Sequence, residues 1–121
     1  MSQKIKLGLV TPTRDFNFVE DTCEAFISIA KSDTCIGEVI NAASNFEISI
    51  GETARLISKL MNTKIEIISE DKRVRPINSE VTRLYGDNKR IKQLTDWAPK
   101  YCGVKGFELG LSKTIEWFSN P

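Results

Sequence analysis

Two arginines, Arg14 and Arg75, are the side chains of this sequence best suited to hold an anion. Arg14 opens the run RDFNFVED, and Arg75 lies in the run RVRPINSEV some sixty residues later. A guanidinium group presents a planar fork of donors that matches phosphate oxygens, so two arginines that converge on one ligand predict a diphosphate site. Pro76 keeps the backbone of Arg75 out of the helical region, which favours an extended pose for this residue. The alternative for either arginine is a surface ion pair.

Carboxylates beside these arginines each have two interpretations. Glu80 suits the acceptance of hydrogen bonds from ribose hydroxyls, and its alternative is to cap the start of a helix. Asp21 precedes an apolar periodic segment, which predicts a helix N-cap more than a ligand contact. Asp15 and Asp21 are also the expected partners if Arg14 forms a structural ion pair.

The sequence contains no self-sufficient catalytic set. Histidine is absent, and the three cysteines show no CxxC spacing, so imidazole-based catalysis and a zinc site are not expected. A Tyr followed four residues later by a Lys occurs at Tyr85/Lys89 and at Tyr101/Lys105. Both pairs run through glycine-containing turns, so neither is expected to lie on one helix. We therefore predict no catalytic residue and no metal ligand in this chain.

Composition predicts one domain of an ordinary cytoplasmic protein. The chain has 121 residues, of which 40% are hydrophobic, and this length suits a single compact unit. Seventeen basic and sixteen acidic residues leave a net charge of +1, which argues against a nucleic-acid surface built on a broad positive field. No apolar run is long enough to span a membrane or resembles a signal peptide, so no membrane partner is expected.

The pattern of apolar residues predicts an α/β fold, a small mixed sheet with helices packed against it. Strands are expected at residues 4–10, in the RDF segment, at 37–43 and at 64–69, and the first two are expected to pair as a hairpin or close neighbours. Helices are expected from Asp21 to about residue 31, from Ile50 to about residue 61 with Ser49 as N-cap, from Asp87 to Leu94, and over residues 105–118.

Large apolar side chains in these elements are assigned to the interior. On the last helix the inward positions are Phe107, Leu111, Ile115 and Phe118. Phe16 and Phe18 are assigned to the core, and Trp97 and Trp117 to packing positions at helix ends.

Three strings together resemble the C-terminal part of the NAD-dependent epimerase/dehydratase family, which belongs to the extended short-chain dehydrogenases. They are RDFxFVxDT, GEVINAAS and RPxxSEVxRLxGDNxRxKxLxxWxP, and they cover the chain from about Lys4 to Phe118. The strongest likeness is to UDP-N-acetylglucosamine 4,6-dehydratases of the legionaminic-acid type. The resemblance implies a nucleotide-diphosphate sugar as ligand, with Arg14 and Arg75 at the diphosphate and Glu80 at the ribose.

The resemblance also implies a larger parent enzyme that uses NAD. Family members carry a GxxGxxG turn in an N-terminal Rossmann domain, and this sequence contains no such string. We therefore expect residues 1–121 to form one truncated, catalytically incomplete substrate-binding part that binds no cofactor itself. The expected partners are the sugar nucleotide and the missing Rossmann domain.

A second hypothesis makes the chain a self-associating structural or interaction module. Without a neighbouring strand, the predicted strand at residues 37–43 becomes an open edge with an uncovered apolar face. A dimer or a domain swap would cover that edge.

Overall fold

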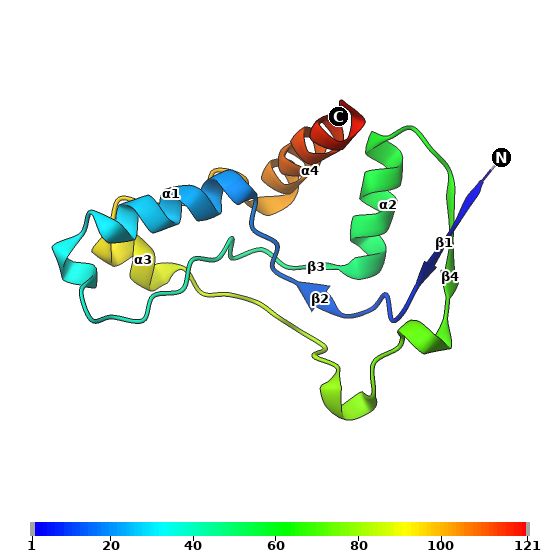
Figure 1. Cartoon of the computed structure of the whole chain (residues 1–121), viewed down its shortest axis with the longest axis horizontal. Coiled ribbons are helices and arrows are strands. Elements are labelled where there is room, and N and C mark those ends of the chain that lie inside the picture. The colour runs from blue at the N-terminus through cyan, green and yellow to red at the C-terminus, as the bar shows by residue number, and fades with distance from the viewer. Residues whose placement is uncertain (1, 121) are drawn as a thin grey trace.

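Two short sheets organise this protein in the computed structural model, which describes residues 2–120 (Figure 1). Strand β1 (Gln3–Leu7) pairs in parallel with β4 (Ile65–Ser69), and β2 (Thr13–Arg14) pairs antiparallel with β3 (Ile48–Ser49). The predicted α/β class is confirmed. The expected hairpin between the first two strands is wrong, because β1 pairs with β4 instead. This pair is parallel, and parallel strands are joined by a long crossover connection and not by a hairpin turn.

Four α-helices accompany these sheets within residues 2–120. They are α1 (Val19–Ala30), α2 (Ile50–Leu60), α3 (Lys89–Leu94) and α4 (Gly103–Ser119). Short 3₁₀ turns lie at Asp33–Cys35, Asp71–Arg73 and Ile77–Ser79. Figure 1 shows α1 and α3 at one end of the molecule, α2 and the β1–β4 pair at the other, and the two later 3₁₀ turns on a protruding loop.

The most buried cluster joins α1 to α3. Ala25, Ile91 and Trp97 are almost fully buried there, so the predicted packing role of Trp97 is confirmed. The Trp97 indole N–H also donates to the Asp21 carbonyl oxygen at 2.9 Å, which satisfies its only polar group. A second apolar region centres on Phe107 of α4, which is stacked by Phe16 at a centroid distance of 5.8 Å.

Helix α2 begins with the predicted N-cap, Ser49, as part of a capping box with Glu52. The Ser49 hydroxyl accepts the Glu52 backbone N–H at 3.1 Å, and the Glu52 carboxylate accepts the Ser49 N–H at 3.2 Å. Beyond its C-terminus, Asn62 adopts a positive φ of 51°. The predicted N-cap of this helix is therefore confirmed.

Residues 37–43 do not form the predicted strand. No strand pairs with them among residues 2–120, and the carbonyl oxygens of Ala42 and Ala43 instead accept the side-chain amides of Asn17 and Asn88. The RDF segment likewise contributes only Thr13 and Arg14 to a strand. Apolar composition alone does not make a strand where no neighbouring backbone supplies a ladder.

Three side-chain predictions are also wrong. Asp21 is not an N-cap, because α1 begins earlier with Phe18 in that position, and Asp21 accepts the backbone N–H groups of Lys100 and Tyr101 at 2.9 Å each. Phe118 and Trp117 are more than 70% exposed, because they lie on the final turn of α4, which extends past the other elements. They pack on each other edge to face at 4.8 Å.

Candidate functional site

The candidate site forms where residues 80–84 pass alongside β2. The Thr13 backbone N–H donates to the Thr82 carbonyl at 2.9 Å, and the Leu84 N–H donates to the Thr13 carbonyl at 3.1 Å. On its other edge, Thr13 pairs with Ser49 of β3. Backbone pairing of this kind brings the end of the second arginine motif beside the first, although the motifs are far apart in sequence.

Arg14 and Glu80 are in direct contact in this frame. Nη1 of Arg14 donates to the carbonyl oxygens of Thr13 and Val81 at 2.7 Å each, and Nη2 donates to Oε1 of Glu80 at 3.2 Å. Both side chains are mostly buried, with 18% and 15% exposed. The alternative prediction, an ion pair of Arg14 with Asp15 or Asp21, is wrong, because the ion-pair partner is Glu80. Glu80 does not start a helix, because it follows the 3₁₀ turn Ile77–Ser79.

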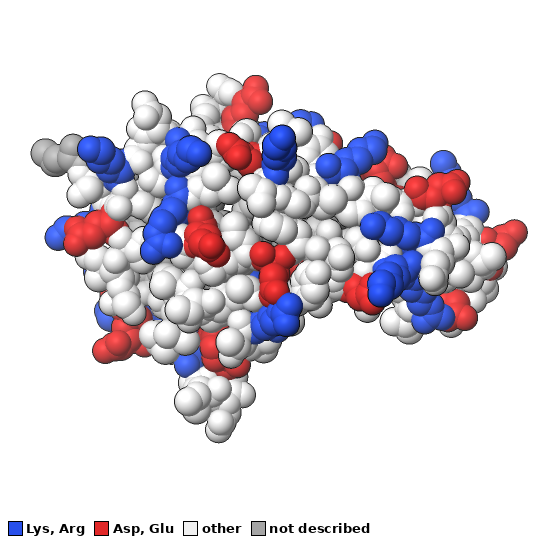
Figure 2. All heavy atoms as spheres, turned by 180° about the vertical axis from the view of Figure 1, so that it is seen from behind, with Lys and Arg blue, Asp and Glu red and all other residues white. Residues whose placement is uncertain are grey.

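Arg75 lies apart from these contacts, on the exposed loop between the 3₁₀ turns Asp71–Arg73 and Ile77–Ser79. Within residues 2–120 it makes no hydrogen bond or ion pair, whereas its neighbour Arg73 bonds Glu70 at 2.7 Å. The full donor fork of Arg75 is therefore open to a ligand. Figure 2 shows acidic and basic side chains mixed over the face in view, which fits a local anion site better than a broad positive field.

Asp15 fixes the position of Arg14 by linking β2 to two other segments. Its Oδ1 accepts the Ser44 backbone N–H at 3.1 Å, and its Oδ2 accepts the N–H groups of Asn45 and Gly86 at 3.1 Å each. Sequence reasoning missed this role, since it considered Asp15 only as an ion-pair partner. The available signal is the position of Asp15, whose carboxylate directly follows Arg14 at the end of β2 and can accept backbone N–H groups of neighbouring segments.

A second ion pair lies on the other side of Thr13. Glu47 accepts the Thr13 hydroxyl and the Arg83 Nε–H at 2.8 Å each. The hydrogen bond from Arg83 and then that from Thr13 lower the pKa of Glu47, and the same contact raises the pKa of Arg83. Arg83 is thus held by Glu47 while its side chain remains largely exposed.

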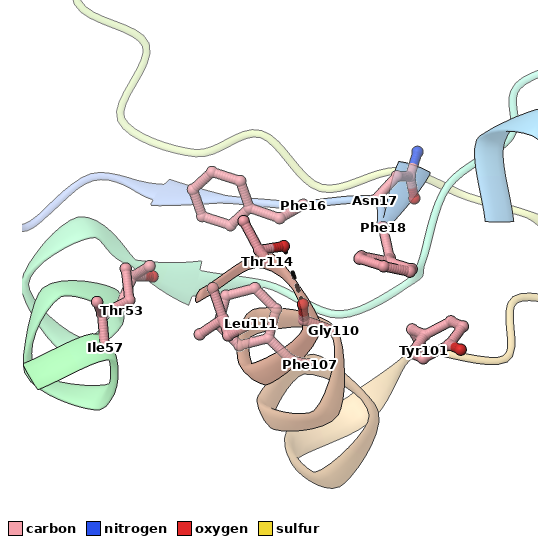
Figure 3. Close-up of a pocket in the computed structure, with 10 residues that line it drawn as sticks. All are labelled: Phe16, Asn17, Phe18, Thr53, Ile57, Tyr101, Phe107, Gly110, Leu111 and Thr114. Carbon is pink, nitrogen blue, oxygen red and sulfur yellow. Dashed lines mark hydrogen bonds between the residues drawn. The ribbon is translucent and has the colours of Figure 1, made fainter. Parts of the chain in front are cut away.

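An apolar cavity of about 280 Å³ opens between α2, α4 and the segment before α1 (Figure 3). Aromatic rings dominate its wall, and sequence reasoning did not predict it. Its lining residues are Phe16, Asn17, Phe18, Thr53, Ile57, Tyr101, Phe107, Gly110, Leu111 and Thr114. Phe18 therefore faces a cavity and not a filled core, and its ring lies 4.5 Å from that of Tyr101.

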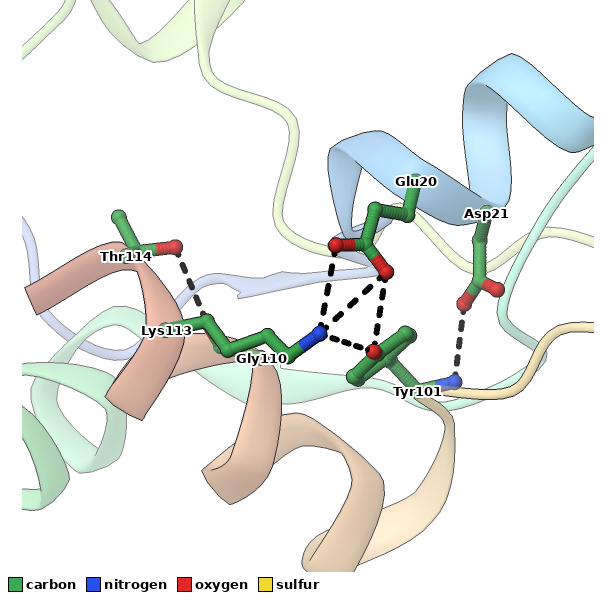
Figure 4. Close-up of polar contacts among 6 residues, drawn as sticks. All are labelled: Glu20, Asp21, Tyr101, Gly110, Lys113 and Thr114. Atoms are coloured by element: carbon green, nitrogen blue, oxygen red, sulfur yellow. Dashed lines mark hydrogen bonds and ion pairs between the residues drawn. The ribbon is translucent and has the colours of Figure 1, made fainter. Parts of the chain in front are cut away.

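Beside this cavity, Glu20, Tyr101 and Lys113 form a polar cluster (Figure 4). The Tyr101 hydroxyl donates to Glu20 at 3.0 Å and accepts from Lys113 Nζ at 2.7 Å. The hydrogen bond from Tyr101, followed by that from Lys113, lowers the pKa of Glu20. The same cluster raises the pKa of Lys113, chiefly through Tyr101. The four-residue spacing in the sequence pairs Tyr101 with Lys105. In the structure it is Lys113, farther along α4, that donates to the Tyr101 hydroxyl, and sequence reasoning missed this residue.

The strand-to-helix junction at Ser49 does not fit a dinucleotide pyrophosphate. Its first three backbone N–H groups donate to the carbonyl oxygens of Pro12 and Val10 and to the Ser49 hydroxyl. The Glu52 carboxylate beside them would repel a pyrophosphate. Tyr85 and Tyr101 both lie outside helices, so neither Tyr/Lys pair shares one. Among residues 2–120, no three His, Cys, Asp or Glu side chains gather as a metal site.

No helix within the described part of the chain is long and apolar enough to cross a membrane.

A family model described as GDP-mannose 4,6 dehydratase matches residues 1–109, which is most of the chain. The chain belongs to the NAD-dependent epimerase/dehydratase family of extended short-chain dehydrogenases. The match confirms the resemblance read from the three sequence strings. It also covers Arg14, Arg75 and Glu80, which therefore lie in the family-matched region.

Individual relatives agree with this assignment. A UDP-N-acetyl-alpha-D-glucosaminuronate decarboxylase of Bacillus cytotoxicus is 32% identical over 108 residues, which are 88% of this chain and 32% of the relative. The structure of a UDP-N-acetylglucosamine 4-epimerase of Methanobrevibacter ruminantium in complex with UDP-N-acetylmuramic acid superposes with a TM-score of 0.79 and 26% identity, over 98% of this chain and 34% of that one. A dTDP-glucose 4,6-dehydratase of Bacillus anthracis in complex with NAD gives 0.76 and 27%, over 97% and 35%.

The chain spans about a third of the length of the curated relatives it matches.

Proposed function

We propose that residues 1–121 are the sugar-nucleotide-binding part of an NAD-dependent nucleotide-sugar 4,6-dehydratase or epimerase. The observation that carries the proposal is the contact between Arg14 and Glu80 in a chain of this family. Arg75, in the same motif as Glu80, has no hydrogen-bond or ion-pair partner among residues 2–120. The proposed ligand is a nucleotide-diphosphate sugar. UDP-N-acetylglucosamine is the proposed example, because two of the relatives above are named for UDP-N-acetyl sugars.

Each of the three residues has a distinct role in this proposal. Arg75 offers an unoccupied guanidinium fork to the diphosphate, and Arg14 adds its remaining donors. The second carboxylate oxygen of Glu80, which Arg14 does not use, accepts a ribose hydroxyl. Binding the remote nucleotide diphosphate holds the sugar in register for chemistry at another part of the enzyme. Neither the dinucleotide nor a catalytic Tyr/Lys pair is assigned to these residues.

Isothermal titration calorimetry of the 121-residue chain with UDP-N-acetylglucosamine tests the proposal. We expect weak binding that falls at least about tenfold in Arg75→Gln, because a charge-assisted hydrogen bond contributes about 1.5–3 kcal/mol. Arg73→Gln is the matched control, since it removes an equal charge from the same loop at a side chain already held by Glu70. Equal affinities for the two variants would overturn the assignment of Arg75.

Residues 36–43 favour self-association as a second candidate function. Ile36 and Val39 are about 80% exposed (78% and 84%), and the backbone beside them has no strand partner among residues 2–120. A second copy of the chain would supply both the ladder and the apolar cover. Light scattering tests this candidate: a concentration-dependent dimer that Val39→Lys abolishes would support it, and a monomer at all concentrations would remove it.

A further inference from the structure

We propose that the apolar cavity between α2, α4 and the segment before α1 binds a neutral aromatic molecule of two fused rings that carries a hydrogen-bond donor (Figure 3). The inference goes beyond the proposed function and does not depend on it. Within the described part of the chain, the residues that line this cavity include none of Arg14, Arg75 and Glu80.

The volume and the walls of the cavity set the size and shape of its ligand. An apolar cavity of about 150 Å³ holds one benzene ring, so a cavity of about 280 Å³ has room for two fused rings. The rings of Phe16 and Phe107 lie 5.8 Å apart, and those of Phe18 and Tyr101 lie 4.5 Å apart. Together they offer faces and edges to a further flat ring. Phe16 is 36% exposed, so the wall that it forms reaches the surface and gives a ligand a way in.

The charge of the lining predicts a neutral ligand. Among residues 2–120, those that line the cavity carry no charged side chain. A charged group that entered would lose its hydration without an ion-pair partner, at a large cost in free energy. Lys113 and Glu20 lie beside the cavity, where they pair with each other and hold the Tyr101 hydroxyl between them (Figure 4).

The two threonine hydroxyls of the lining offer acceptors and not donors. The Thr53 hydroxyl donates to the Ser49 carbonyl oxygen at 2.9 Å, and the Thr114 hydroxyl donates to the Gly110 carbonyl oxygen at 2.9 Å. Because a hydroxyl has one hydrogen and two lone pairs, each of these oxygens can still accept but has no hydrogen left to donate. An N–H or O–H on the ligand satisfies such an oxygen, whereas an acceptor on the ligand finds no hydroxyl hydrogen.

Thr53 is the threonine best placed to confer this preference. Its side chain is half-buried on α2, where water competes less for the hydroxyl oxygen, whereas Thr114 and Asn17 are exposed. The amide of Asn17 keeps an acceptor oxygen and one N–H beyond its bond to the Ala42 carbonyl, so it does not discriminate between the two kinds of ligand. The donor of the ligand is therefore assigned to the Thr53 hydroxyl.

Isothermal titration calorimetry of the 121-residue chain with indole and with benzofuran tests the proposal. The two molecules have nearly the same shape, but indole carries an N–H donor where benzofuran carries an oxygen. We expect saturable binding of both at one site. The ratio of indole affinity to benzofuran affinity should fall about fivefold in Thr53→Val, which is the factor that one neutral hydrogen bond contributes.

Thr22→Val is the matched control for this ratio. Thr22 is also half-buried, and its hydroxyl likewise bonds the carbonyl oxygen four residues earlier, but it does not line the cavity. The ratio in this variant should equal that of wild type.

Filling the cavity gives a second, independent test. Leu111→Trp places a larger side chain in the cavity and should abolish indole binding. Leu109→Trp makes the same change on α4 at a side chain that is 54% exposed and outside the cavity, so it should bind indole as wild type does. Circular dichroism shows whether each variant is folded.

Three results would overturn the inference. They are the absence of saturable indole binding to the wild-type chain, an affinity ratio that is unchanged in Thr53→Val, and full indole affinity in a folded Leu111→Trp variant. If Leu111→Trp does not fold, the Thr53→Val ratio decides alone. All of these results leave the proposed function intact, because that function is tested by UDP-N-acetylglucosamine binding at other residues.

Discussion

Replacement of Asp15 by asparagine is expected to destabilise the fold more than any charge-neutralising change at an exposed aspartate. Each carboxylate oxygen of Asp15 accepts more than one hydrogen bond, from groups of Ser44, Asn45 and Gly86. An asparagine places an amide in the position of one oxygen, so the donors that met this oxygen then face another donor. With about 1–3 kcal/mol for each donor left unsatisfied, two lost bonds predict a loss of about 2–6 kcal/mol.

Urea unfolding followed by circular dichroism measures this loss. A domain whose free energy of unfolding lies above this loss, within the ordinary range of about 5–15 kcal/mol, remains folded in Asp15→Asn, and we expect a clearly lower urea midpoint with an unchanged slope. Asp71→Asn is the control, because Asp71 is exposed and its side chain makes no hydrogen bond among residues 2–120, and it should change stability by less than about 0.5 kcal/mol. Equal midpoints for the two variants would refute the role given to Asp15.

Two further predictions concern pH and the arginine loop. The lowered pKa of Glu20 contributes stability that is complete above its ordinary value of 4.5 and is lost as pH falls through the folded value, so Glu20→Gln should flatten the acid limb of urea midpoint against pH. The raised pKa of Lys113 contributes stability that is complete below 10.5 and is lost as pH rises further, so Lys113→Gln should flatten the alkaline limb; limbs parallel to wild type would contradict these signs. In Gly8→Ala the new Cβ would overlap the Arg73 carbonyl oxygen, so we expect a loss of about 1–3 kcal/mol in urea unfolding and weaker UDP binding. Asn78→Ala, in the exposed loop that also carries Arg73, should leave the urea midpoint and the UDP affinity unchanged. A wild-type urea midpoint for Gly8→Ala would show that this loop shifts without cost.

Locally encoded features could be predicted from the sequence. Helix α2 was predicted with its cap, because Ser49 and Glu52 lie within one turn and satisfy each other's backbone groups without help from other segments. The strand at residues 64–69 was likewise predicted within one residue of its observed start, because its alternation is independent of its partner.

Features that depend on distant partners could not be predicted in this way. The alternation of residues 4–10 indicates a strand, but it does not say that the partner lies some sixty residues away in parallel. Asp21 precedes a helical pattern, so its local interpretation was a cap, and only the tertiary fold shows that Lys100 and Tyr101 donate to it. The same limitation applies to the candidate site: Arg14 and Glu80 were both predicted, but their mutual contact was not.

The long sequence separation between Arg14 and Glu80 has a consequence for how the chain acquires its native state. The two residues are 66 positions apart, and the bonds of Asp15 to Gly86 and of Asp21 to Tyr101 close even larger separations, 71 and 80. Such non-local contacts lose loop entropy before they gain energy, so they form slowly and late. While the polypeptide is being synthesised, Arg14 emerges long before its partner carboxylate exists, and the contact between them can form only after residues 80–84 have docked beside β2.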